Sequence, residues 1–311
     1  TEQAKNSAQS DKRFAVVGSG PSGFFTSEAL LKQYPGASID LIEKLPVPFG
    51  LVRFGVAPDH PKIKSVSQNF TQLMKDHSTL NFFGNVEVGK DIERDYLVNH
   101  YDAIVYTTGG STSKTLNIPG NELNGVYGSA EFVGWYNGHP EQKELSPNLK
   151  TSVMSIIGMG NVALDIGRIV CLPHDELHRT DAAFHALEYL VFSDIEQVNI
   201  IARKSPIQAA FTPKELQQLI DHPSINIEVD ANDLVFDDAM EASLALPENA
   251  EAKENIQLLR SIKKPENNGN KTIRFMFNRN PEAIEGNNGK VSQLKLGINK
   301  VSLDSQQKLL V

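Results

Sequence analysis

The sequence predicts an α/β protein with two Rossmann-like dinucleotide-binding domains. Two glycine-rich turns carry this prediction, one at residues 18–23 (Gly-Ser-Gly-Pro-Ser-Gly) and one at residues 158–163 (Gly-Met-Gly-Asn-Val-Ala). Each turn follows an apolar, strand-like run and opens a helix-like run. Such a turn lets the backbone approach a pyrophosphate, and the N–H groups that begin the helix attract its charge. Two turns in one chain indicate two bound cofactors that exchange electrons, usually a flavin and a nicotinamide.

Length and composition allow both domains. The chain has 311 residues, of which 40% are hydrophobic, enough for two cores. The turn-dense stretch 117–125 suggests a boundary, so we place the first domain at residues 1–110 and the second at residues 111–311. No apolar run approaches the roughly 20 residues of a membrane span, and residues 1–13 lack an apolar signal core. We therefore expect a soluble protein without a membrane span.

Charge and cysteine content exclude several classes. The formal net charge of −8, without a basic stripe carrying aromatic residues, argues against nucleic acid as a partner. The one cysteine, Cys171, cannot form a disulfide framework, a cysteine-ligated zinc site or an iron–sulfur cluster. It also excludes the Cys-x-x-Cys pair of a thioredoxin-reductase-like enzyme. Cys171 follows an apolar helix-like stretch, so we expect it to be buried and inert.

The first nucleotide unit begins with a strand at residues 14–18, a helix at 22–33 and a strand at 38–43. Glu43 lies 20 positions after Gly23, where the motif expects an acid that binds ribose hydroxyl groups. Glu43 thus favours a ribose with a free 2′-OH. The alternative is a solvated carboxylate at a strand end.

The rest of this unit is less regular. Residues 45–61 contain too much proline and glycine for a regular element, yet are apolar enough to form an ordered, packed loop. A helix over about 62–75 and strands near 81–88 and 103–106 follow. The last strand ends in small residues that include Gly109, which suits either close approach to a nucleotide or a plain tight turn.

The second unit begins with a strand near 152–158. A helical insertion at about 177–192 delays its next strand, 198–202, which Arg203 and Lys204 follow directly. Cations at this strand end can bind a 2′-phosphate through charge-assisted hydrogen bonds. The first site is therefore predicted to take a 2′-OH dinucleotide and the second NADPH, unless the two cations only form a solvated strand end.

The remaining residues are interpreted as additions to the second domain. Residues 230–270 are acidic and then rich in lysine and asparagine, and we expect a peripheral insertion with helices near 238–244 and 250–262. Residues 273–277 and 291–296 are predicted to be strands joined by a loop at 286–289, forming a small antiparallel addition.

Longer motifs identify a family. With the first glycine turn, the segments 43–61, 132–138, 158–165, 203–204 and 211–216 resemble adrenodoxin-reductase-type ferredoxin–NADP reductases, over about residues 13–220. The resemblance implies a glutathione-reductase-like flavoprotein in which NADPH gives a hydride to FAD. The reduced flavin would then pass single electrons to an iron–sulfur ferredoxin. Residues 1–110 would be the N-terminal part of the FAD-binding domain, and residues 111–311 the NADPH-binding domain.

The resemblance also assigns residues. His60 and Glu215 resemble a pair that lines the route between flavin, nicotinamide and solvent, and both are candidate catalytic residues. From the residues alone, His60 is equally a capped turn histidine and Glu215 a carboxylate that stabilises a helix N-terminus. The residues expected to bind FAD are Gly18, Gly20, Pro21, Ser22, Gly23, Glu43, Lys44, Leu51 and Gly109. Those expected to bind NADPH are Gly158, Gly160, Asn161, Val162, Arg203, Lys204 and Glu215.

The sequence departs from the family at its C-terminal end. The family completes its FAD domain there with a Gly-Trp segment, whereas the single tryptophan of this chain is Trp135. We therefore expect an incomplete FAD domain. One alternative is an NADPH-binding module without flavin turnover. Another is a glutamate-synthase-type electron-transfer subunit, disfavoured because its cysteine-rich cluster module is missing.

A partner surface and a compartment complete the expectations. A basic face for an acidic ferredoxin could be formed by Lys214, Arg260, Lys263, Lys264 and Arg274. Nearby glutamates dilute it, and scattered solvated cations would give the same pattern. The family occurs in the bacterial cytoplasm and the mitochondrial matrix, and the sequence does not decide between them.

Overall fold

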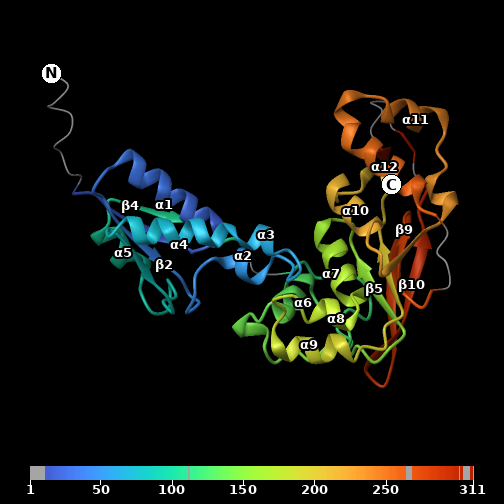
Figure 1. Ribbon diagram of the computed structural model, residues 1–311, viewed down its shortest axis with the longest axis horizontal. Helices are drawn as coiled ribbons and strands as arrows, with labels where there is room; N and C mark the ends of the chain where they lie inside the picture. The colour runs from blue at the N-terminus through green and yellow to red at the C-terminus, as the bar shows by residue number, and fades with distance from the viewer. Residues whose placement is uncertain (1–10, 111–112, 264–267, 301, 304–308, 311) are drawn as a thin grey trace. The chain divides into compact units, whose positions relative to one another are not determined.

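The structure, a computed structural model, describes residues 11–110, 113–263, 268–300, 302–303 and 309–310. The chain divides into two compact units (Figure 1). The first unit comprises Thr1–Thr112 and Val133–Lys143, and the second Ser113–Phe132 and Glu144–Val311. The segment Val133–Lys143 thus returns to the first unit, whereas the sequence-based domains assign it to the second.

The first unit contains a parallel four-stranded sheet of order β3-β2-β1-β4. Strand residues such as Val16 and Leu41 are fully buried, as expected for a parallel sheet covered by helices. Phe24 of α1 stacks on Phe70 of α4, with ring centroids 4.6 Å apart. The strands are β1 (Arg13–Val17), β2 (Ser38–Ile42), β3 (Leu80–Phe83) and β4 (Ala103–Tyr106). The helices are α1 (Pro21–Gln33), α2 (Gly50–Phe54), α3 (Pro61–Lys64), α4 (Val66–Asp76) and α5 (Arg94–His100).

Two predictions for this unit need correction. The helix expected over about 62–75 is two helices, α3 and α4, with Ser65 between them. The proline- and glycine-rich loop at 45–61 contains the short helix α2. Phe49 and Gly50, at φ 89° and 44°, turn the backbone sharply into α2, and Val52 and Phe54 are then buried. The apolar residues of this segment therefore form one regular turn of helix.

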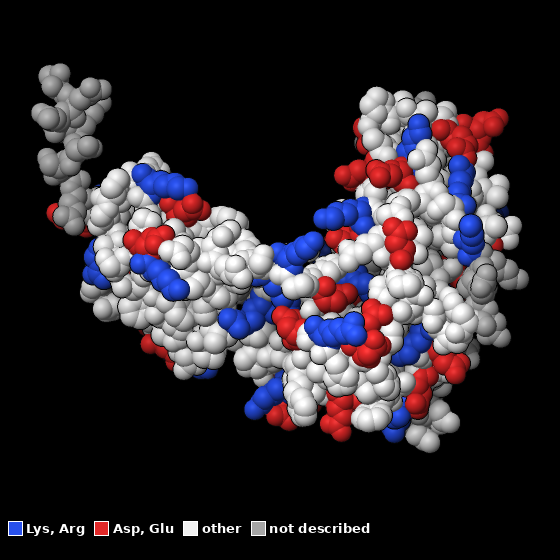
Figure 2. Space-filling view, in the orientation of Figure 1, with Lys and Arg blue, Asp and Glu red and all other residues white. Residues whose placement is uncertain are grey.

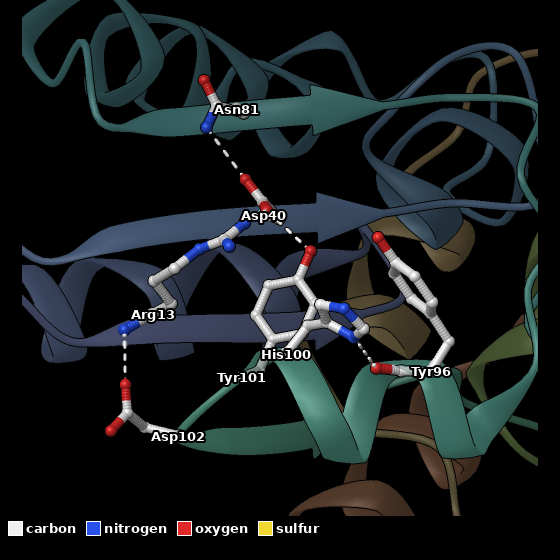
Figure 3. A network of polar contacts seen from close by, with 7 residues as sticks. All are labelled: Arg13, Asp40, Asn81, Tyr96, His100, Tyr101 and Asp102. Atoms are coloured by element: carbon white, nitrogen blue, oxygen red, sulfur yellow. Dashed lines mark hydrogen bonds and ion pairs between the residues drawn. The ribbon is translucent and has the colours of Figure 1, made fainter.

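A polar network joins the strands of this sheet (Figure 3). Asp40 of β2, 5% exposed, accepts hydrogen bonds from the Tyr101 hydroxyl at 2.7 Å and from Asn81 Nδ2 at 2.8 Å. Arg13 Nη2 of β1 lies 3.4 Å from the Asp40 carboxylate, and the Arg13 N–H donates to Asp102 at 2.8 Å. The carboxylate of Asp40 is thereby satisfied inside the sheet, as a buried charge requires.

Tyr101 makes this network sensitive to alkaline pH. Burial, and then the hydrogen bond to Asp40, raises the pKa of Tyr101 to about 12, above the ordinary value of about 10. Because the raised pKa belongs to the folded state, the stability that this group contributes is complete below about pH 10 and is lost toward about pH 12.

Replacing this tyrosine tests the linkage. We expect Tyr101→Phe to destabilise the first unit by about 1 kcal/mol at pH 8 through the lost hydrogen bond. Its further loss of stability between pH 10 and 12 should be smaller than that of the parent protein. Urea unfolding at several pH values measures both effects. If parent and variant lost the same free energy of unfolding between pH 10 and 12, the assignment of this pH dependence to Tyr101 would be wrong.

The second unit contains another parallel sheet, of order β5-β6-β8-β7. Together the two parallel sheets confirm the predicted α/β class. The strands are β5 (Val153–Ile157), β6 (Gln197–Ile201), β7 (Ile225–Val229) and β8 (Lys271–Met276). Helix α6 (Ser129–Tyr136) begins in the second unit and ends in the first, and the 3₁₀ turn η2 (Pro140–Gln142) belongs to the first. The other α-helices of the second unit are α7 (Asn161–Cys171), α8 (His174–Leu177), α9 (Phe184–Val191), α10 (Pro213–Ile220), α11 (Asp238–Leu244) and α12 (Ala250–Ser261). Its short 3₁₀ turns are η3 (Pro206–Gln208), η4 (Ala231–Leu234) and η5 (Pro247–Asn249).

The predicted antiparallel addition is partly wrong. Residues 273–276 of the predicted run lie in β8, a central parallel strand between β6 and β7. The antiparallel ribbon instead pairs β9 (Arg279–Asn287) with β10 (Lys290–Ile298). Asn288 and Gly289, both at positive φ, form the tight two-residue connection that such hairpins favour. Short strands β11 (Ser302–Leu303) and β12 (Leu309–Leu310) pair with each other.

The segment interpreted as a peripheral insertion is packed into the unit. In α12, Asn255, Ile256 and Leu259 are each no more than 2% exposed. Asn255 Nδ2 donates to the Phe211 carbonyl at 3.0 Å, just before α10, and Figure 1 draws α12 in orange beside α10. Helix α12 therefore supports the start of α10.

A substitution measures this support. Asn255→Ala is expected to lower the free energy of unfolding of the second unit by about 1.5 kcal/mol, because the buried Phe211 carbonyl loses its donor. Glu254→Ala, at an exposed neighbouring position, should change it by less than about 0.5 kcal/mol. Urea denaturation compares the two variants, and equal stabilities would refute a supporting role for Asn255.

The structure also places the single cysteine and shows the character of the helices. Cys171 is 2% exposed, which confirms that it is buried. Burial raises the pKa of its thiol to about 12, and a thiol that stays protonated is expected to be unreactive. Among the described residues, none of the helices has the length and apolar character needed to cross a bilayer.

Candidate dinucleotide-binding sites

The first glycine turn is closely packed against its own unit. Gly18 has φ +105°, and a Cβ there would lie 2.5 Å from the Thr107 carbonyl oxygen. A Cβ on Gly23 would collide with the Gly18 carbonyl. Gly20 differs, because it caps α1 in an extended conformation and its Cβ would meet nothing closer than 3.9 Å. Gly18 and Gly23 thus permit the close packing of the turn, and Gly20 leaves space beside the N-terminus of α1.

Glu43 directly follows β2 and holds the turn in place. Its Oε2 accepts hydrogen bonds from Ser19 N at 2.9 Å and Ser19 Oγ at 2.8 Å, and its Oε1 accepts from Leu45 N at 3.0 Å. The residue is 9% exposed. A carboxylate offers about four acceptor sites, so Glu43 retains capacity for a ribose hydroxyl. The sequence analysis missed Ser19, whose signal was a hydroxyl between two turn glycines.

The other predicted FAD residues lie at the start of α1, on the short helix α2 and in loops that follow β2 and β4. Pro21 and Ser22 form the first turn of α1. Lys44 forms an ion pair with Glu141 at 2.8 Å. Leu51 on α2 is 67% exposed, and Gly109 after β4 has φ +68° with open space around it.

His60 occupies the N-cap position of α3. It is 9% exposed, and its carbonyl accepts from the N–H groups of Ile63 and Lys64. This placement agrees with the turn-histidine interpretation and leaves its catalytic role a prediction. His60 belongs to the first unit and Glu215 to the second.

The second glycine turn is open. Gly158 has φ +132°, and Gly160 caps α7 in an extended conformation. A Cβ on either glycine would meet no described atom within 4 Å. Val162 in the first turn of α7 is 50% exposed. The turn therefore presents the helix N-terminus to open space, as a pyrophosphate site requires.

Asn161 connects this turn to α10. Its Oδ1 accepts a hydrogen bond from Thr212 N at 2.9 Å, and Thr212 Oγ1 accepts from Glu215 N at 3.4 Å. In a capping box, the N–H of the N-cap residue Thr212 would donate to the Glu215 carboxylate. Here that N–H donates to Asn161 instead, so the Glu215 carboxylate has no capping role. One of its oxygens lies within 4.8 Å of an Asp165 oxygen. The structure therefore brings Asn161 and Glu215 together through Thr212.

Arg203 and Lys204 follow β6 after one residue, Ala202, and both are exposed. The glycine turn follows β5, the neighbouring strand. Ligands of open α/β sheets bind at the carboxyl ends of such strands. The two cations and the second glycine turn thus share one edge of the second sheet.

Fold and sites define the class: an α/β protein with two Rossmann-like dinucleotide-binding domains. A family model described as an NAD(P)-binding Rossmann-like domain matches residues 16–85. The NADPH-ferredoxin reductase FprA of Mycobacterium leprae is 43% identical over 297 residues, which cover 93% of this chain and 64% of that protein. The human mitochondrial NADPH:adrenodoxin oxidoreductase is 48% identical over 224 residues, covering 72% of this chain and 45% of that protein. The chain belongs to the family of NADPH-ferredoxin and NADPH:adrenodoxin reductases, which confirms the resemblance.

The structural comparison agrees. Mycobacterium tuberculosis FprA in complex with NADPH matches with a TM-score of 0.90 at 40% identity, over 97% of this chain and 66% of that chain. The chain thus spans about two thirds of the length of its bacterial relatives and less than half of the human one.

Proposed function

We propose that this protein is a flavin-dependent oxidoreductase that takes a hydride from NADPH and passes single electrons to an iron–sulfur ferredoxin. The observation that carries the proposal is the contrast between the two strand ends. Glu43, with acceptor capacity to spare, follows β2, and the exposed pair Arg203 and Lys204 follows β6. An acid suits a 2′-OH ribose and cations suit a 2′-phosphate, so we assign FAD to the first site and NADPH to the second.

The residues present fit both cofactors. Gly20 and Gly160 each leave space above a helix N-terminus, where N–H groups would bind a pyrophosphate. Bound FAD would supply the electron sink, and the protein would set the distance and angle between the reacting rings. The other contacts that we propose are those that the resemblance implies: Lys44, Leu51 and Gly109 for FAD, and Asn161, Val162 and Glu215 for NADPH.

We assign catalytic roles to His60 and Glu215. An imidazole near the flavin can relay a proton at a ring nitrogen near neutral pH. The carboxylate of Glu215 is left out of the usual capping arrangement, which favours a role toward the nicotinamide. We also propose that residues 1–110 belong to the FAD-binding domain and residues 111–311 to the NADPH-binding domain.

The proposed partner is an iron–sulfur ferredoxin of the adrenodoxin type, bound through basic residues of the second unit. Lys214 and Lys263 are exposed, which supports this surface, whereas Arg260 forms an ion pair with Glu241. Figure 2 shows acidic and basic side chains interspersed over the second unit, so the attraction would be local. Lys264 lies outside the described residues. The relatives are bacterial and mitochondrial, and we propose one of these two compartments.

One experiment tests the function. The purified 311-residue chain, supplied with FAD, should show flavin absorbance and reduce a ferredoxin at the expense of NADPH. A protein that binds NADPH and retains no flavin would be a nicotinamide-binding module instead, and the proposed catalysis would be wrong for this chain.

A further inference from the structure

The backbone that carries the two cations of the second site is held by residues beyond β8, the strand that pairs with β6 on the side away from β5. The Arg203 carbonyl accepts a hydrogen bond from Asn299 Nδ2 at 2.9 Å. The Lys204 carbonyl accepts from the backbone N–H of Asn278 at 3.1 Å. These donors come from the β8–β9 turn and from the residue after β10, 74 to 96 positions further along the chain. The two carbonyls are thus fixed by one structural feature, the base of the β9–β10 ribbon.

The two asparagines are also joined to each other. Asn299 N donates to the Asn278 carbonyl at 2.9 Å. Asn278 has φ +54°, a left-handed conformation that asparagine adopts more readily than most residues. Ala202, which precedes Arg203, is already held by backbone hydrogen bonds: its N–H donates to the Met276 carbonyl and its carbonyl accepts from the Arg279 N–H, each at 2.9 Å. The two asparagines therefore hold the backbone beyond the end of β6, at Arg203 and Lys204.

Fixing the carbonyls matters for the side chains. Because the peptide unit is planar, holding successive carbonyl groups restricts φ and ψ and so the direction of each Cα–Cβ bond. Arginine and lysine side chains are long and lose much rotamer freedom when they bind. A fixed starting direction lowers this cost, which is the general benefit of preorganisation.

We propose that Asn278 and Asn299 are positioning residues for recognition of an adenosine 2′-phosphate. They hold the backbone of Arg203 and Lys204 so that both cations can reach one phosphate. The inference rests on the proposed function, in which this pair distinguishes NADPH from NADH. It adds residues that contact no ligand themselves and act on cofactor preference through the backbone of Arg203 and Lys204.

Binding of small fragments to the full chain tests the proposal without flavin or turnover. Isothermal titration calorimetry gives the dissociation constants of 2′,5′-ADP, which carries the 2′-phosphate, and of 5′-AMP, which lacks it. Asn299→Ala should weaken 2′,5′-ADP about fivefold, the effect of one lost hydrogen bond. The affinity for 5′-AMP should stay within about twofold. Asn299→Asp keeps the side-chain shape, loses the donor and adds a negative charge, so it should weaken 2′,5′-ADP further.

Controls separate this inference from the proposed function. Asn287→Ala, at an exposed position at the other end of the ribbon, should bind both fragments as the parent does. If the parent prefers 2′,5′-ADP and both Asn299 variants keep that preference, the positioning role is overturned and the proposed function stands. An equal loss for both fragments also overturns it. If the parent shows no preference for 2′,5′-ADP, the 2′-phosphate site and this inference both fail. Should Asn299→Ala not fold, Asn299→Leu, which is close in size, neutral and without a donor, gives the decisive comparison.

Discussion

The Gly160→Ala variant is expected to bind NADPH about 100-fold more weakly than the parent while folding nearly as well. Gly160 has an extended backbone, and its Cβ would meet no described atom within 4 Å. The methyl group therefore strains nothing in the protein, and the N-cap change should cost about 1 kcal/mol or less. The same methyl would occupy the space above α7 where the pyrophosphate binds. Steric overlap between the methyl group and the pyrophosphate that costs about 3 kcal/mol of binding free energy corresponds to this 100-fold loss of affinity.

Gly20→Ala is the matched variant in the first unit. Its Cβ would lie 3.9 Å from the Gly50 Cα, an ordinary contact, so this variant should also fold. It is expected to lose flavin and keep NADPH binding, whereas Gly160→Ala should lose NADPH and keep flavin. Flavin content after reconstitution and calorimetric titration with NADPH measure the two affinities. If either variant lost both cofactors, or neither, the assignment of one cofactor to each turn would be wrong.

The second large effect concerns cofactor preference. Replacing both cations, as Arg203→Gln with Lys204→Gln, is expected to reduce the preference for NADPH over NADH by about 100-fold. Each charge-assisted hydrogen bond to a phosphate contributes about 1.5–3 kcal/mol. Of the two single variants, Arg203→Gln should reduce the preference for NADPH more than Lys204→Gln, because a guanidinium can bind phosphate with two parallel donors and an ammonium cannot.

The measurement is kcat/KM for each nicotinamide with an artificial electron acceptor. The expected change is a fall for NADPH, with NADH altered by less than about threefold. Lys290→Gln, an exposed cation on the β9–β10 ribbon, serves as the control and should change neither value. A double variant that still prefers NADPH as strongly as the parent would remove Arg203 and Lys204 from the site.

The parts of the fold set by local pattern were predictable from the sequence. The strand, glycine turn and helix at residues 14–33 combine an apolar run with a motif that only this geometry accommodates. Glu43 was correctly expected at the end of β2, because the spacing of the motif fixes its place. The interaction partner of a strand is not a local property, however. The run at 273–277 has the pattern of any buried strand, so its central parallel position between β6 and β7 could not be deduced.

The candidate sites show the same limit. The glycines and the cations stand in recognisable motifs, whereas the residues that hold them do not. Asn299 contacts the Arg203 carbonyl across 96 positions, and Asn255 reaches the Phe211 carbonyl across 44. Such contacts between a side chain and a distant backbone leave no periodicity or spacing in the sequence. They become visible only when the chain is folded.

The central claim is that one chain binds a flavin at the site of Glu43 and NADPH at the site of Arg203 and Lys204. Electrons would pass from the NADPH to the flavin. Anaerobic titration of the FAD-reconstituted protein tests it most directly. We predict that the visible flavin absorbance is bleached by about one equivalent of NADPH per flavin, and far less by the same amount of NADH. Bound flavin that stays oxidised in the presence of NADPH, or bleaches equally with NADH, would contradict the account.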